Sequence, residues 1–277
     1  MQEKLIMYTS EETFIHRLSG LTKLISFLVL TSAVMYTYDI RVIVGILIFS
    51  FALMKVAKIK FSKVKTMFLY VFIFLLLNEF ITFLFAPTEG VKIFGTSHVL
   101  FELSSRYVVT LEQIFYQTTK FLKYISVIPL GMIFLFTTNP SELASSLNRI
   151  GVHYKVAYAF ALTLRYFPDV QRVYTDISLS QQARGVDLSY KAKFKDRFKH
   201  SLLILIPLIF SSLERVEKIS NAMDLRGFGK HKKRTWYTTK KLRKEDYVAL
   251  VISGMVLLIS VLIGMFVNHG RFYNPFI

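Results

Sequence analysis

Two arginine-glycine pairs are the residues whose types and spacing most clearly suggest chemistry. The first copy runs Ile177-Ser178, five residues and Arg184-Gly185, and the second runs Ile219-Ser220, five residues and Arg226-Gly227, 42 residues later. Each pair follows a stretch that can be helical, so we expect each arginine in a last helical turn with a glycine just beyond it. On the watery side of a membrane protein, two arginines presented in this way suggest contacts with another protein.

A simpler interpretation of each pair is a helix stop. Glycine commonly follows a helix, and an arginine in the last turn suits the helix dipole. This interpretation accounts for a single pair. It accounts less well for two copies that share an Ile-Ser dipeptide at the same offset, so the functional interpretation stays open beside it.

The composition identifies the class of protein. The 277 residues are 53% hydrophobic and 15% aromatic, which is typical of a membrane protein rather than a soluble domain. The net charge is +17, which favours an anionic lipid surface or an acidic protein as partner, whereas nucleic acid is not expected. There is no cysteine, which excludes disulfides and thiolate metal sites.

The apolar segments predict an all-α integral membrane protein with about five transmembrane helices. A spanning helix needs about 20 mostly apolar residues, so the first two segments are slightly short. A tight turn at Tyr38-Asp39 separates these two, and Thr88 to Gln117 is expected to be a polar loop with at most a short helix. The expected spans are 24–38, 40–57, 67–86, 118–137 and 247–267.

The region between the last two spans has a different character and predicts a helical domain on the cytoplasmic side. Asn139-Pro140-Ser141-Glu142 is a good helix start, and Leu143, Leu147 and Ile150 then fall on one face before Gly151 ends the helix. The apolar runs 156–164 and 202–210 are too short to span, and we expect them to be core or re-entrant pieces. The predicted domains are therefore 1–137 (four transmembrane helices), 138–246 (the cytoplasmic helical domain) and 247–277 (the last transmembrane helix and tail).

The distribution of charge orients this arrangement. Cytoplasmic loops and flanks collect Lys and Arg, and five lysines lie in the short linker between the second and third spans. With a cytoplasmic N-terminus, 29 of the 35 basic residues fall on the inner side, including the run Lys230 to Arg234. The sequence thus predicts a multi-pass protein of the cell membrane with its N-terminus in the cytoplasm.

The titratable residues do not predict an enzyme. There is no Gly-rich nucleotide-binding loop, and the six histidines have no metal-ligand spacing, so no cofactor or metal site is expected. Glu79 lies inside the third span, where a carboxylate suggests function by default. The structural alternative is that Glu79 snorkels toward the outer membrane surface or pairs with Lys120 or Lys123.

Several of these motifs, in this order, resemble the transmembrane (T) component of energy-coupling factor (ECF) transporters, the EcfT family of ATP-binding-cassette (ABC) importers. Ala183-Arg184-Gly185 and Leu225-Arg226-Gly227 are similar to the family's paired Ala-Arg-Gly motifs, although Leu225 stands where alanine is usual. The resemblance covers nearly the whole chain. It also rests on His16-Arg17-Leu18 with Lys23, on Thr137 to Leu143, and on Leu164-Arg165-Tyr166-Phe167-Pro168.

The resemblance implies a non-catalytic scaffold for uptake of a vitamin or trace metal. Two cytoplasmic ATPase subunits would bind the coupling helices through Ala183, Arg184, Gly185, Leu225, Arg226 and Gly227. A small membrane protein, the substrate-binding S component, would lie against this chain and be reoriented when the ATPases close. The substrate would be chosen by the S component, so this chain does not name it.

Two other classes stay open at this point. An ordinary ABC permease would carry one main coupling segment, which the repeated Arg-Gly pair does not favour. An independent polytopic membrane protein with a basic cytoplasmic domain, such as an enzyme acting on lipid phosphates, would need clustered His and Asp residues at the inner interface. The chain has few carboxylates there.

Overall fold

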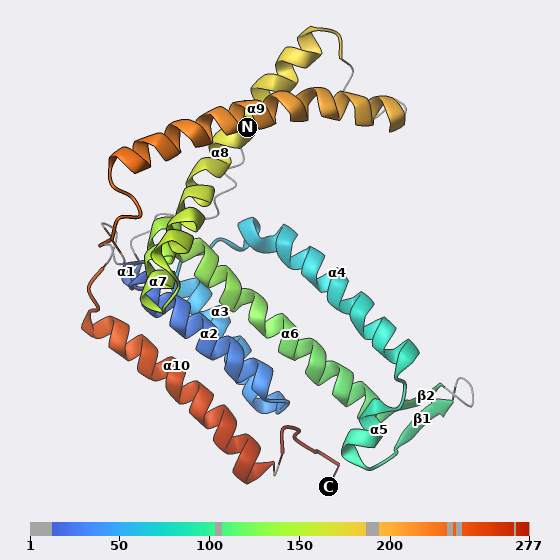
Figure 1. Ribbon diagram of the computed structural model, residues 1–277. Helices are drawn as coiled ribbons and strands as arrows, with labels where there is room; N and C mark the ends of the chain where they lie inside the picture. Colours follow the sequence, from blue (N-terminus) through green and yellow to red (C-terminus); the bar gives the residue numbers. More distant parts are fainter. Residues whose placement is uncertain are drawn as a thin grey trace. The chain divides into compact units, whose positions relative to one another are not determined.

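The structure is a computed structural model that describes residues 13–102, 107–186, 194–231, 235–236, 240–268 and 270–276. Helices account for nearly all of the described secondary structure, and the described strands form one two-stranded sheet (Figure 1). The prediction of an all-α membrane protein is confirmed. Most of the predicted basic run, residues 232–234, lies outside the described part.

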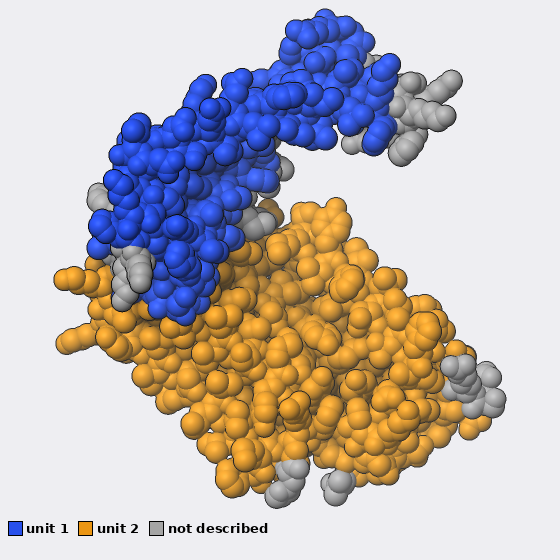
Figure 2. Space-filling view, in the orientation of Figure 1, with its two compact units in different colours: residues 1–7, 140–239 blue, residues 8–139, 240–277 orange. Residues whose placement is uncertain are grey.

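The chain forms two compact units (Figure 2). Among the described residues, unit 1 consists of those within 140–239, and unit 2 of those within 13–139 and 240–276. Each unit is described by itself below.

Unit 2 contains the apolar helices. Three of its helices are long and apolar enough to cross a membrane, over Val64–Phe85, Leu111–Thr137 and Lys244–Val267, while α2 and α3 are shorter, with 17 residues each. The elements of unit 2 are α1 (Phe14–Arg17), α2 (Gly20–Tyr36), α3 (Ile40–Val56), α4 (Phe61–Phe85), α5 (Glu89–Phe94), β1 (Val99–Glu102), β2 (Val108–Thr110), α6 (Leu111–Thr137), α10 (Lys244–Leu262) and the π-helical turn η1 (Ile263–Val267).

Helix α6 holds this unit together, because α2, α3, α4 and α5 all pack against it. One apolar cluster joins α2, α3 and α6 through Val34, Ile46 and Leu130, and a second joins α3, α4 and α6 through Met54, Val64 and Met132. Helix α10 packs along α2. The extensive burial of α6 explains how it carries polar side chains that a lipid-facing helix would not tolerate.

Two buried lysines of unit 2 stabilise helix ends. The ammonium of Lys23 donates to the carbonyl of Thr137 at the end of α6 (2.6 Å), and that of Lys123 donates to the carbonyl of Met35 near the end of α2 (2.7 Å). The last carbonyls of a helix have no partner within it and carry partial negative charge, so a cation suits them. Both lysines are therefore accounted for structurally.

The predicted loop over 88–117 is largely wrong. Residues 89–94 form α5, the strands β1 and β2 form a hairpin, and α6 begins at Leu111 rather than at 118. Helix α5 approaches α6 closely, because a side chain at Gly90 would overlap the backbone of Glu112. The polar residues that suggested a loop instead satisfy one another at the start of α6.

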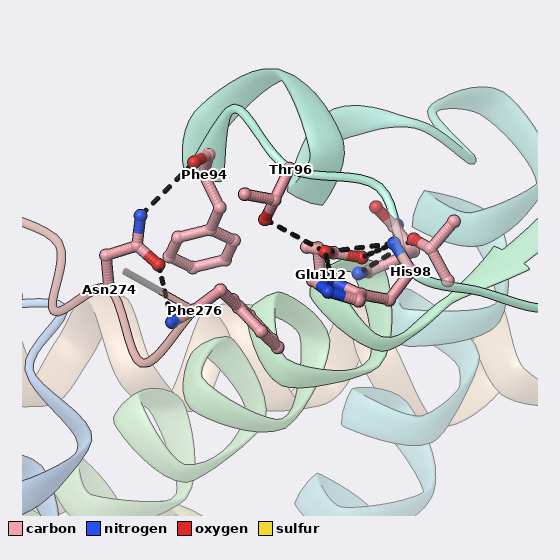
Figure 3. Close-up of polar contacts among 8 residues, drawn as sticks. Phe94, Thr96, His98, Glu112, Asn274 and Phe276 are labelled. Atoms are coloured by element: carbon pink, nitrogen blue, oxygen red, sulfur yellow. Dashed lines mark hydrogen bonds and ion pairs between the residues drawn. The ribbon is translucent and has the colours of Figure 1, made fainter.

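Figure 3 shows this arrangement around Glu112. The carboxylate of Glu112 is fully buried and accepts from the hydroxyl of Thr96 (2.9 Å) and the backbone N–H of His98 (3.0 Å). Beside it, the amide of Asn274 donates to the carbonyl of Phe94 (3.1 Å), and the ring of Phe276 packs on that of Phe94. These contacts join α5, α6 and the segment that follows η1.

Unit 1 consists of α7 (Pro140–Arg149), α8 (Tyr154–Ala183) and α9 (Phe194–Leu225). Helix α8 packs against both α7 and α9, and α8 and α9 are long, with 30 and 32 residues (Figure 1). The prediction that 156–164 and 202–210 are separate short pieces is wrong, because each lies inside one of these helices. Pro168 lies inside α8 and Pro207 inside α9.

Candidate functional site

The candidate site lies on unit 1, and its first helix is α7. Both the start and the end of α7 were predicted from the sequence. The helix starts at Pro140 and ends before Gly151, which has φ +110°, a left-handed conformation that favours glycine. The buried face of α7 consists of Ala144, Ser145 and Ser146, whereas the predicted apolar face is only part-buried, with Ile150 46% exposed. The small buried residues let α7 pack closely on α8.

Helix α8 ends at the first Arg-Gly pair in a Schellman motif. The backbone N–H of Gly185 donates to the carbonyl of Gln182 (2.9 Å), and that of Val186 donates to the carbonyl of Gln181 (3.1 Å). Arg184 is the C-cap residue and Gly185 has φ +84°. Arg184 thus lies at the helix terminus itself, directly after Ala183, the last residue of α8.

Helix α9 ends at the second pair in the same motif. The N–H of Gly227 donates to the carbonyl of Asp224 (2.9 Å), and that of Phe228 donates to the carbonyl of Met223 (3.0 Å). Gly227 has φ +68°. The repeat in the sequence is therefore a repeat in structure, down to the individual backbone hydrogen bonds.

The residues around both arginines face outward. Ala183, Arg184, Leu225 and Arg226 are all exposed, and Leu225, which stands in place of the usual alanine, is 90% exposed. In the described part of the chain neither arginine forms an ion pair. Both guanidinium groups are thus accessible to a partner's acidic groups.

The two helix ends lie well apart within unit 1. Helices α8 and α9 cross, and the C-terminal end of α8 lies at the top of Figure 1, while that of α9 lies at the left. The arrangement presents two separate arginines rather than one joint cationic site.

The end of α9 is anchored to the start of α8 by aromatic side chains that sequence reasoning missed. The ring of Phe228 lies 4.9 Å from that of Tyr158 and 5.7 Å from that of Tyr154, measured between centroids. Trp236 packs on Tyr158 as well, and its indole N–H donates to the side-chain oxygen of Asn148 on α7 (3.0 Å). No local pattern could have paired these residues, because they come from four different segments.

The crossing of α8 and α9 is hollowed by a groove of about 330 Å³. It is mostly apolar and includes Tyr166 and Val170 on α8 and Val216 and Ile219 on α9. The isoleucine of the second Ile-Ser copy therefore lines the groove. Next to the groove, Asp169 of α8 pairs with Arg215 of α9 (3.5 Å).

Glu79, the carboxylate inside the third predicted span, lies on α4 of unit 2. Glu79 pairs with Lys120 (3.4 Å), so the predicted ion pair is confirmed, while Lys123 contacts the ring of Tyr38 instead. Within the described residues, no group of three or more His, Asp or Glu side chains is placed to hold a metal ion.

Comparisons with known proteins agree on one family. A family model described as CbiQ, cobalt transport protein, matches residues 11–237, which include both Arg-Gly pairs. The energy-coupling factor transporter transmembrane protein EcfT of Exiguobacterium sibiricum is 25% identical over 260 residues, covering 90% of this chain and 92% of that protein. The protein of the same name from Leuconostoc gelidum is 27% identical over 259 residues (90% and 93% covered), and that from Listeria innocua is 30% identical over 148 residues (49% and 56% covered).

Proposed function

Because the chain belongs to the EcfT family of energy-coupling factor transporter transmembrane proteins, we propose that it couples two cytoplasmic ATPase subunits to a small substrate-binding membrane protein, the S component. In this role the chain transmits movement and catalyses nothing itself, since ATP hydrolysis belongs to the partner subunits. The imported substrate is a vitamin or a trace metal, and the S component selects it.

The observation that carries this proposal is the pair of separated helix ends with the same backbone geometry. Each end presents one exposed arginine, and each is followed by a glycine in the left-handed conformation. Two such ends fit two ATPase subunits, one arginine for each. An ordinary permease with a single coupling segment would not need the duplication.

Arginine suits this contact for physical reasons. Its planar guanidinium pairs with a carboxylate through two parallel hydrogen bonds and stays charged when partly desolvated. We propose that Arg184 and Arg226 each enter a groove on one ATPase and meet carboxylates there. Gly185 and Gly227 let the chain turn away directly after the arginine, so that no side chain at these positions blocks the contact with the ATPase.

The apolar surface of unit 1 supports an S component as the further partner. Helix α9 exposes Leu205, Ile206, Ile209 and Phe210, with exposed fractions between 47% and 64%. A contiguous exposed patch of this kind marks contact with lipid or with another apolar protein. The position of these residues on a helix that ends at Arg226 would connect the S component with an ATPase through one rigid element.

The orientation in the cell membrane follows from charge. Arg17, Lys55, Lys60 and Arg243 all lie near the ends of unit 2 helices where α2 and α10 begin and α3 ends. Cytoplasmic flanks collect Lys and Arg, so we propose that this end of unit 2 and the N-terminus face the cytoplasm.

The test is a double charge reversal, Arg184→Glu with Arg226→Glu, in the full chain co-expressed with its transporter partners. We expect the variant to insert into the membrane but to lose the ATPases in an affinity purification. The matched control is Arg172→Glu with Lys218→Glu, which makes the same change of charge further back along α8 and α9 and should leave ATPase yield unchanged. Recovery of the ATPases at wild-type yield with the double reversal at positions 184 and 226 would contradict the proposal.

A further inference from the structure

Unit 2 contains an apolar slot that its own side chains leave unfilled. The slot has a volume of about 150 Å³ and lies between α2, α3, α6 and α10, with α1 over one end. Its lining includes Leu18, Phe27, Leu53, Ile133, Ala249 and Ile252. The lining also includes four polar side chains, Lys23, Ser26, Thr137 and Ser253. Each of them already bonds within the protein, so the slot offers little to a polar ligand.

The slot opens toward the surface that faces hydrocarbon. Val248 and Ile252 belong to its lining and are 53% and 38% exposed on α10, a helix apolar enough to span the membrane. Apolar cavities of roughly 150 Å³ exclude water and take up apolar molecules. In a bilayer, the apolar group available to fill such a slot is a lipid acyl chain.

A second, polar pocket of about 270 Å³ adjoins the slot. It shares Phe14 and Leu18 with the slot, and its other lining residues are Arg17, Arg243, Glu245 and Asp246. Asp246 is 2% exposed, and its two carboxylate oxygens accept from the backbone N–H groups of Ser19 and Arg243, at 2.8 Å each. These hydrogen bonds satisfy the carboxylate of Asp246 but leave its negative charge in place, so the charged residues that line the pocket are two arginines and two carboxylates.

An acyl chain suits the apolar slot, and a phosphate suits the two guanidinium groups of the adjoining pocket. We propose that unit 2 binds an anionic phospholipid, with an acyl chain in the slot and the headgroup phosphate at Arg17 and Arg243. Arginine binds phosphate oxygens in a bidentate manner, and basic pockets between membrane helices on the cytoplasmic side hold anionic headgroups. Lys244 adjoins Arg243 at the start of α10 and adds to the positive charge of this end.

The site would have a structural consequence for α1. Residues Phe14, Ile15 and Leu18 of this short segment line the slot, and Arg17 lines the pocket. A bound lipid would fix α1 against α6 and α10. This inference goes beyond the coupling role and does not depend on it.

The experiment measures lipid binding by native mass spectrometry on the full chain, purified in mild detergent with whatever partners accompany it. After delipidation, phosphatidylglycerol and phosphatidylcholine with the same acyl chains are titrated back. We expect one retained phospholipid per wild-type chain and a roughly 10-fold preference for phosphatidylglycerol, equivalent to about 1.4 kcal/mol. Inorganic phosphate alone should not displace it.

Two variants test the two halves of the site. Ala249→Leu fills the slot and should reduce retention of both lipids at least 10-fold, whereas Ala249→Ser, which keeps the volume, should not. Arg17→Gln with Arg243→Gln should remove the preference for phosphatidylglycerol, and Lys55→Gln with Lys60→Gln, which removes the same charge at the same end of unit 2, should keep it. Elution profiles and melting temperatures establish that each variant is folded.

The proposal is overturned by any of four results. These are a wild-type chain that retains no phospholipid, equal retention by Ala249→Leu, an unchanged headgroup preference in the double arginine variant, and full displacement by inorganic phosphate. The last result would indicate an anion site without a chain-binding slot.

Discussion

The two Arg-Gly helix ends of unit 1 are alike locally and differ in what holds them. Both close with a Schellman motif, and both place an exposed arginine before a left-handed glycine. Beyond the motif, Phe228 packs on Tyr154 and Tyr158. Near the end of α8, the side-chain amide of Gln181 donates a long hydrogen bond, 3.5 Å, to the carbonyl of Leu203 on α9.

This difference shows that the same sequence motif can end a helix with or without side-chain packing behind it. Backbone hydrogen bonds define the shape of each terminus, whereas side-chain packing determines how firmly that terminus is held. We therefore expect the α9 end to be the more rigid of the two and the α8 end to adapt more on binding a partner.

The largest effect should come from reversing one arginine at a time. Truncating one member of a desolvated charge pair costs about 2–5 kcal/mol, so Arg184→Glu and Arg226→Glu should each weaken ATPase assembly roughly 30-fold or more. Native mass spectrometry of the purified complex measures how many ATPase subunits each variant retains. If one single variant loses all binding and the other loses none, the two ends are not equivalent contacts.

Removing the aromatic anchor should distinguish the two ends. Phe228→Ala should loosen the α9 terminus by about 1–3 kcal/mol, below the cost for a fully buried Phe because this ring is only part-buried. Val186→Ala, at the equivalent position after α8, is the matched control and should cost less. Limited proteolysis after α9 for Phe228→Ala and after α8 for Val186→Ala gives the measurement. An equal loss of protection in the two variants would show that the ring does not anchor the helix end.

The two glycines should respond alike, because their local geometry is the same. Gly185→Ala and Gly227→Ala force a left-handed alanine, which costs about 1–2 kcal/mol, whereas asparagine tolerates this conformation better. At Gly227 the new Cβ would also meet the side chain of Lys230 at 3.3 Å, but that flexible chain can move. Hydrogen exchange of the preceding turn is the readout, and a much larger loss at one site would mean that the shared motif does not determine the response.

Exchanging the residue before each arginine should have a small effect. Leu225→Ala removes a side chain that is 90% exposed, so stability should change by no more than about 0.5 kcal/mol. Ala183→Leu is the reciprocal change at the other end. Both variants should keep the ATPases in a pull-down, and loss of binding in Leu225→Ala would identify Leu225 itself as a contact.

A change in unit 2 should leave both ends unaffected. Asp39 begins α3, and although burial opposes its ionisation, hydrogen bonds from Arg41 and Asn268 lower the pKa of this carboxyl below its ordinary value. Its contribution to stability should thus be present above about pH 3.9, the ordinary value for Asp, and be lost as the pH falls through the lower folded pKa. Asp39→Asn should lower the melting temperature at pH 7 and approach wild type in acid, and ATPase binding at pH 7 should be normal. A constant difference in melting temperature between the two proteins across this pH range would contradict the assignment.

Local features of the sequence predicted local structure well. The stop signals at Gly151, Gly185 and Gly227 and the start at Pro140 were all readable, because caps depend on a few adjacent residues. The pairing of Glu79 with Lys120 was also predicted, since a membrane carboxylate needs a cation nearby.

Features that depend on distant packing were not predicted. The runs 156–164 and 202–210 were expected to be short core or re-entrant pieces, yet each is part of one long helix that continues through Pro168 or Pro207. The start of α6 was missed because Glu112 and Gln113 suggested a loop, and only the contacts with Thr96, His98 and Gly90 make their burial favourable. The anchor at Phe228 has no local signature at all.

The length of α8 gives unit 1 a mechanical property. A helix of 30 residues is about 45 Å long at 1.5 Å per residue. If such a rod pivots by about 10° near its first turn, its far end sweeps about 8 Å. Helix α8 starts among the rings of Tyr154, Tyr158 and Phe228 and ends at Arg184. The aromatic cluster is therefore the pivot point of α8, and Arg184 is the residue that such a rotation would displace most.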